Sequence, residues 1–85
     1  MNEHARKKDF VNIVDVEYRL KWDESKLAWD VFRNGAVTDV SGRKKRKSAV
    51  DSAIRLAKTE QDASKAVIMV TAMEGRKLQI LWQAP

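Results

Sequence analysis

The sequence predicts a small α+β domain with the element order β-β-β-α-β-β, in which a mostly antiparallel sheet has one helix packed on one face. Three observations predict this fold. A single stretch, directly after the basic run 43–47, has the 3.6-residue spacing of an amphipathic helix. The stretches before and after it alternate apolar and polar side chains, as strands do. Asn34-Gly35 and Gly75 provide turns between neighbouring strands.

The first strand is expected from residue 10 to residue 22. Residues 1–9 are polar, charged and without periodicity, so they are expected to form a flexible tail, and residues 10–85 a single domain. From residue 10 onward every second side chain is mostly apolar, which predicts a strand with one face on the core. The inward residues are Phe10, Val14, Val16, Tyr18, Leu20 and Trp22. Residues 23–26 are polar and predict a turn.

Two more strands complete a meander. The second is expected over 27–33, with Leu27, Trp29 and Val31 facing the core. Asn34-Gly35 favours a type I′ hairpin turn, because both central residues of that turn need positive φ. A third strand is expected over 36–40, and Ser41-Gly42 then ends the meander.

The helix is predicted to begin near Ser48. Ser48 and Asp51 have the spacing of a capping box, in which the serine oxygen accepts a backbone N–H of the first turn. The apolar face has the spacing i, i+3, i+4, i+7, and its members are Val50, Ala53, Ile54 and Ala57. Small alanines on this face suggest a close approach to the sheet. Residues 59–65 are polar and are expected to be a connection.

The last two strands form a hairpin. Residues 66–73 open with an apolar run of five, which predicts a central strand covered on both faces. Glu74-Gly75-Arg76 is the turn, and 77–83 is the fifth strand. Alternation predicts that Leu78, Ile80 and Trp82 face inward and that Lys77, Gln79 and Gln83 face outward.

The charge is concentrated in one segment. The 85 residues have a formal net charge of +5, from 17 basic and 12 acidic side chains. Five of the basic residues are consecutive: Arg43, Lys44, Lys45, Arg46 and Lys47. Because a helix N-terminus also attracts anions, this run and Ser48 are predicted to bind the phosphates of nucleic acid or another polyanion, largely without regard to sequence. The competing interpretation is a solvated loop without a ligand.

A second function class rests on the sheet face opposite the helix. Alternation places Ile13, Phe32 and Leu81 there, with Val11, among charged side chains. This surface predicts a protein-interaction or homo-oligomerisation module, and a homodimer would suit so short a chain. The three tryptophans share the side of the aliphatic residues and are expected in the core rather than as base-stacking platforms.

Catalysis, metal binding and membrane insertion find little support. The chain has no cysteine, and its one histidine, His4, lies in the expected tail. Asp15 and Glu17 are interpreted as alternating surface charges of a strand rather than as paired catalytic carboxylates. The longest apolar run, 66–70, is far shorter than the roughly 20 residues that cross a bilayer. We therefore expect a cytoplasmic, non-enzymatic domain without cofactor, metal or membrane partner.

Several motifs together resemble a known family. They are Trp29-Asp30-Val31, Asn34-Gly35, Lys47 before an alanine-spaced helix, the aliphatic strand 67–70 and Gly75. Between residues 28 and 80 the chain is similar to the small bacterial family called domain of unknown function 2188. That family usually has Thr or Ser before the lysine, where this chain has Arg46, and its loop is less basic. The resemblance implies a compact sheet-and-helix domain and no established activity.

Overall fold

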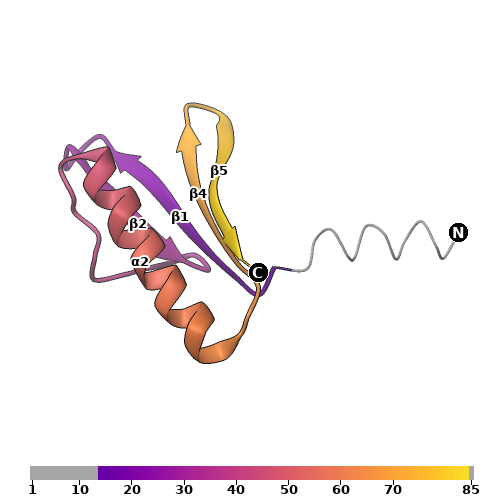
Figure 1. The fold of residues 1–85 in the computed structure, drawn as a ribbon. Coiled ribbons are helices and arrows are strands. Elements are labelled where there is room, and N and C mark those ends of the chain that lie inside the picture. Colours follow the sequence, from indigo (N-terminus) through magenta and orange to yellow (C-terminus); the bar gives the residue numbers. More distant parts are fainter. Residues whose placement is uncertain (1–13, 85) are drawn as a thin grey trace, which may run out of the picture.

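A computed structural model of the chain describes residues 14–84, which form one helix and a five-stranded sheet (Figure 1). The elements are β1 (Val16–Asp23), β2 (Ala28–Arg33), β3 (Ala36–Val37), α2 (Arg46–Ser64), β4 (Ile68–Glu74) and β5 (Lys77–Ala84). The predicted α+β class and the order β-β-β-α-β-β are confirmed. The expected tail 1–9 and the expected start of the first strand at 10–13 lie outside the described residues.

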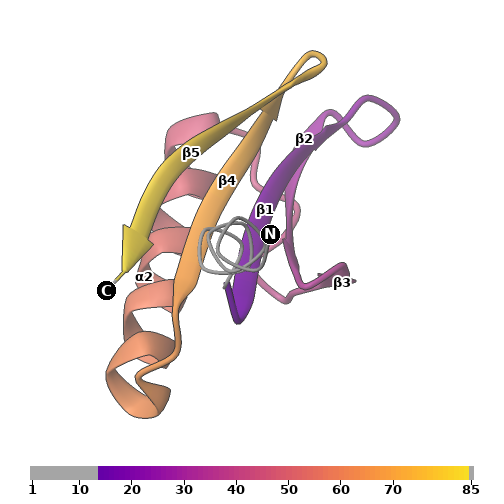
Figure 2. The same ribbon diagram turned by 90° about the vertical axis from the view of Figure 1, so that its right-hand side faces the viewer.

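The strands have the order β3-β2-β1-β4-β5 across the sheet. β1 and β4 are parallel neighbours at its centre, and the other pairs are antiparallel. α2 lies on one face and connects β3 to β4, running in the direction opposite to β4 (Figure 2). The N-terminus of α2 and the β4–β5 turn therefore lie toward the same end of the molecule. We call the sheet face away from α2 the open face.

The core lies between α2 and the sheet. Its strand members are Val16, Tyr18, Leu20, Val31, Ile68, Val70 and Ala72, and its helix members are Ala49, Ala53 and Ala57. A methyl group is all that each alanine places between the two layers, so the backbone of α2 can lie close to the strands. The predicted inward set of the first strand is confirmed for Val16, Tyr18 and Leu20.

The tryptophans are less buried than expected. Trp29 and Trp82 are half-buried and pack against the core. Trp22 was expected to be in the core but is 41% exposed at the end of β1. Its ring meets Trp29 edge-to-face, with 5.6 Å between the ring centroids.

The helix is longer than predicted at both ends, and the predicted capping box is absent. α2 begins at Arg46, its N-cap is Lys45, and no side chain caps it, so Ser48 lies inside the first turns. The helix also continues through residues 59–64, which were expected to be a connection. No Gly or Pro interrupts that stretch, and Lys65 ends the helix in the left-handed conformation at φ 61°.

The strand ends near the turns also differ from the prediction. Leu27 was expected to face the core, but it belongs to the turn, with φ 52°, and is exposed. Asp23 shapes this turn, because its carboxylate accepts the backbone N–H groups of Ser25 and Lys26 at 2.9 and 3.2 Å. The third strand ends at Val37 instead of residue 40. Asn34 and Gly35 have the positive φ angles, 47° and 89°, that the hairpin required.

A β-bulge reverses the predicted sides of residues 77–80 of β5, whereas Trp82 packs against the core as predicted. Val70 pairs with Trp82 and Thr71 pairs with Ile80, so Leu81 is an extra residue in the strand. Leu78 and Ile80 consequently lie on the open face, 46% and 56% exposed, although alternation placed them inward. Gln79 faces α2 instead of pointing outward, and Leu81 packs against the core.

A polar cluster fastens the last turns of α2 to the sheet. The buried Tyr18 hydroxyl donates to Glu60 Oε1, and Arg33 Nε donates to the same oxygen at 3.1 Å. The guanidinium also pairs with the other carboxylate oxygen. Hydrogen bonds from Arg33 lower the pKa of Glu60, while burial opposes this shift and Tyr18 reinforces it. Burial, with Glu60 beside it, raises the pKa of Tyr18.

This cluster predicts sensitivity to acid. The pKa of Glu60 is lower in the folded chain than its ordinary value of 4.5, so its contribution to stability is complete above that value and is lost as the pH falls through the folded-state pKa. We expect Glu60→Gln to cost about 1 kcal/mol at neutral pH and to flatten the fall in unfolding free energy below about pH 4.5. Urea denaturation at a series of pH values measures both.

Asp62→Asn is the matched control for this experiment, because Asp62 is an exposed acid on the same helix. It should leave the acid profile close to that of the original chain. An acid profile that Glu60→Gln does not change would contradict the assignment.

Candidate nucleic-acid interface

The loop that leads into the basic run is fastened to the edge of β2. Gly42 N donates to Trp29 O at 2.9 Å and to Asp30 Oδ1 at 3.1 Å. Arg43 N donates to the same carbonyl at 3.0 Å, and Trp29 N donates to Arg43 O at 2.6 Å. Gly42 has φ 87°, a conformation that glycine adopts without strain. The backbone at Arg43 is therefore held in place before the cations begin.

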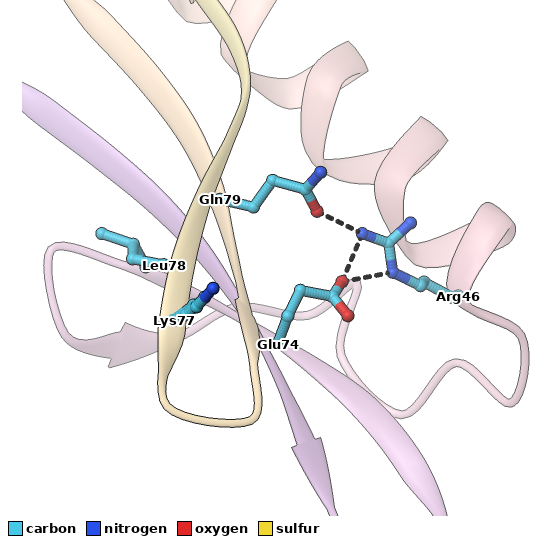
Figure 3. A pocket seen from close by; sticks show the side chains of 5 residues that line it. All are labelled: Arg46, Glu74, Lys77, Leu78 and Gln79. Atoms are coloured by element: carbon cyan, nitrogen blue, oxygen red, sulfur yellow. Dashed lines mark hydrogen bonds and ion pairs between the residues drawn. The ribbon is translucent and has the colours of Figure 1, made fainter.

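Arg46 fixes the other end of the basic run. Its Nη2 lies 2.6 Å from Glu74 Oε2 and 3.2 Å from Gln79 Oε1, and its Nε donates to Glu74 at 3.0 Å (Figure 3). The guanidinium also lies over the ring of Trp29, 5.9 Å from its centroid. Arg46 was predicted to contact phosphate, but its Nε and Nη2 already donate to Glu74 and Gln79. We interpret it as a residue that positions the helix N-terminus against the β4–β5 hairpin.

The other cations of the run face solvent. Lys44 and Lys45 are exposed, and no carboxylate of residues 14–84 lies within ion-pair distance of either. Lys47 is 3.1 Å from Asp51, but its side chain is 87% exposed, so this pair is weak. Only Lys44 and Lys45 separate the two fastened residues, Arg43 and Arg46. Lys44 and Lys45 are therefore held between two fixed residues, with their charges exposed to solvent.

Two cations that the sequence analysis missed lie at the same end. Arg76 and Lys77 are exposed in and beside the β4–β5 turn, and Lys77 lines a shallow hollow together with Arg46 (Figure 3). Because α2 runs antiparallel to β4, the N-terminus of α2 lies toward the C-terminal end of β4. The β4–β5 turn follows that end of β4 directly. We call the six exposed cations the basic end: Arg43, Lys44, Lys45, Lys47, Arg76 and Lys77.

The N-terminus of α2 adds a favourable environment for anions. Its first turn contains no acidic residue, and no side chain caps it. The partial positive charge of a helix N-terminus favours an anion over the cations that surround it here. Ser48 is exposed two residues into the helix, where its hydroxyl is free of the predicted capping role.

The predicted interface on the open face is not assembled from the predicted residues. Ile13 lies outside the described residues. Phe32 lies on the open face, as predicted, but it is half-buried there, and the Lys21 ammonium lies over its ring at 5.4 Å from the centroid. Leu81 packs against the core. The large apolar side chains that are exposed on this face are Leu78 and Ile80 on β5 and Val37 on β3, which pairs with Phe32.

The acidic residues considered for catalysis have separate structural contacts. Asp15 Oδ2 accepts Val67 N–H at 2.8 Å, whereas Glu17 pairs with Arg19 and accepts Thr71 Oγ1–H at 2.8 Å. Within residues 14–84 no group of three or more His, Cys, Asp or Glu side chains is placed to hold a metal ion. The described part of the chain also contains no helix that is long and apolar enough to cross a membrane.

Comparison of the chain with models of protein families, with curated proteins and with solved structures found no match. The resemblance to the domain of unknown function 2188 family stays a prediction.

Proposed function

We propose that this chain is a non-enzymatic domain that binds nucleic acid or another polyanion weakly through the basic end. The observation that supports this most directly is the convergence of two separate basic segments. The Arg46–Glu74 ion pair holds the loop 43–45 beside the hairpin that carries Arg76 and Lys77. Cations gathered from distant parts of a chain form a wider positive surface than either segment alone.

The mode of binding follows from the side chains. Lysine and arginine neutralise backbone phosphates and release condensed counterions, and uncapped N–H groups of α2 can donate to a phosphate oxygen. The backbone of Arg43 and the side chain of Arg46 are already held in place. The loop therefore loses less conformational entropy on binding than a free loop would. The basic end consists of lysine and arginine side chains suited to phosphate, which is the same for every base, so we expect little sequence preference.

One aromatic side chain bears on the choice between single and double strands. Trp22 lies near the end of β1, is partly exposed and contacts Trp29. Arg46 lies over the ring of Trp29. An exposed indole face can stack on an unpaired base but not on one inside a duplex. Tighter binding of a single strand than of a duplex would indicate that Trp22 takes part.

The test is fluorescence anisotropy with a labelled duplex and a labelled single strand at several salt concentrations. Six cations predict a slope of log K against log salt of up to about −5 for the duplex. Replacing both Lys44 and Lys45 with Gln should make the slope less negative by about 2 and weaken binding most at low salt, because two phosphate contacts are lost.

The control is Arg55→Gln with Lys58→Gln, two exposed cations on the outer side of α2. This pair changes the net charge equally, away from the basic end. If both double variants weaken binding to the same extent, the contact is a general effect of net charge and the proposed site is wrong. Absence of binding at low salt would reject the function itself.

A further inference from the structure

The two edges of the sheet differ in how well they are protected. On one side, β3 has only two residues, and the loop 38–43 covers the remaining edge of β2 through hydrogen bonds such as Thr38 N to Val31 O at 2.9 Å. On the other side, β5 is eight residues long and is the last strand of the sheet (Figure 2). Within residues 14–84 no strand or loop pairs with its outer edge.

The side chains of β5 do not protect that edge. Natural edge strands are usually short or carry charges or proline, which prevent pairing with another chain. β5 has a charge only at Lys77, and the seven residues 78–84 contain no charge, proline or glycine. Leu78 and Ile80 are exposed on the open face beside this edge, and Leu78 points away from Arg46 (Figure 3).

We propose that the outer edge of β5 pairs antiparallel with β5 of a second copy, which joins the two sheets into one across a two-fold axis. Two copies of the same edge strand can pair in this way, and the two-fold symmetry limits the assembly to a dimer. A register centred near Gln79 would set Leu78 against Ile80 of the second copy, as an apolar cross-strand pair. The proposal is independent of the proposed binding of polyanions.

The distribution of charge supports a second copy in the antiparallel direction. Arg76 and Lys77 lie at the start of β5, and the rest of the strand is neutral. With the register centred near Gln79, antiparallel pairing sets Lys77 opposite Leu81 of the second copy, so the two Lys77 residues lie about 14 Å apart along the strands at 3.4 Å per residue. That separation exceeds the Debye length of about 8 Å at physiological salt, so the two net charges repel each other little.

Sedimentation equilibrium of the full chain over a wide range of concentrations is the test. We expect a monomer–dimer equilibrium, and Ile80→Lys should weaken it about tenfold or more, because symmetry places the new charge in the interface twice. Val37→Lys is the matched control. Val37 is also an exposed apolar strand residue, 63% exposed, but it lies on β3 at the opposite edge.

Hydrogen exchange on the unaltered chain gives a second readout that does not depend on how a variant folds. Amides along β5 should exchange more slowly at high than at low protein concentration, while those of β3 should not change. A chain that remains monomeric at every concentration overturns the proposal and leaves an extended segment of another protein as the occupant of this edge. A dimer that Val37→Lys weakens equally, or one without slower exchange in β5, overturns it as well.

Discussion

Leu20→Ala is expected to lower the free energy of unfolding by about 2–5 kcal/mol, the largest effect of any single change considered for this chain. Leu20 is fully buried at the centre of β1, where it pairs with Val31 on one side and Ala72 on the other. Its neighbours are strand residues whose backbone is fixed by the sheet, so they can fill little of the space it leaves. Small domains are stable by about 5–15 kcal/mol, and the variant would therefore approach the limit of folding.

Urea denaturation followed by tryptophan fluorescence measures this loss. Leu78→Ala is the control, because it removes the same atoms from a strand residue that is 46% exposed, and its cost should be below about 1 kcal/mol. Equal losses for the two variants would show that Leu20 does not lie in the core described here.

Ala53→Leu is expected to cost about 1–3 kcal/mol through overpacking. Ala53 is fully buried midway between Ala49 and Ala57, on the face of α2 that lies against the strands. A leucine there must push the helix away from the sheet or adopt a strained rotamer. Lifting the helix would also strain the contacts at its two ends, which are Arg46 with Glu74 and Glu60 with Arg33.

The matched control is Ala63→Leu, an exposed alanine of the same helix. It should change stability by less than about 0.5 kcal/mol, because alanine and leucine have similar helix propensities. If Ala53→Leu unfolds at the same urea concentration as the original chain, the alanines do not set the distance between helix and sheet.

The parts of the fold that depend on local pattern could be predicted from the sequence. Val16, Tyr18 and Leu20 face the core because a strand alternates its side chains at every residue. The Asn34-Gly35 turn follows from the backbone conformations that these two residues tolerate. The order of the elements followed from these signals together.

The parts that depend on distant contacts could not be predicted. The bulge at Leu81 is a mismatch between two strands, and neither strand's own pattern contains it. The helix continues to Ser64 partly because Glu60 accepts hydrogen bonds from Tyr18 and Arg33, which are distant in the sequence. For the candidate site, the sequence showed the five consecutive cations. It could not show that Arg46 forms an ion pair with Glu74, or that Arg76 and Lys77 lie near the basic run. If the parallel pairing of β4 with β1 had been known, it would have indicated that Arg76 and Lys77 lie near the basic run.

The parallel pairing of β1 with β4 also determines when the surface can form during folding. The two strands meet across a long stretch of chain, as the bond from Val67 N–H to Asp15 Oδ2 over 52 positions shows. The β1–β2 and β4–β5 hairpins need only short loops to close, whereas joining them costs the entropy of closing the long one. The cations of the loop and of the β4–β5 turn come together only in that slow step. A nascent chain would therefore carry both basic segments before it has one basic surface.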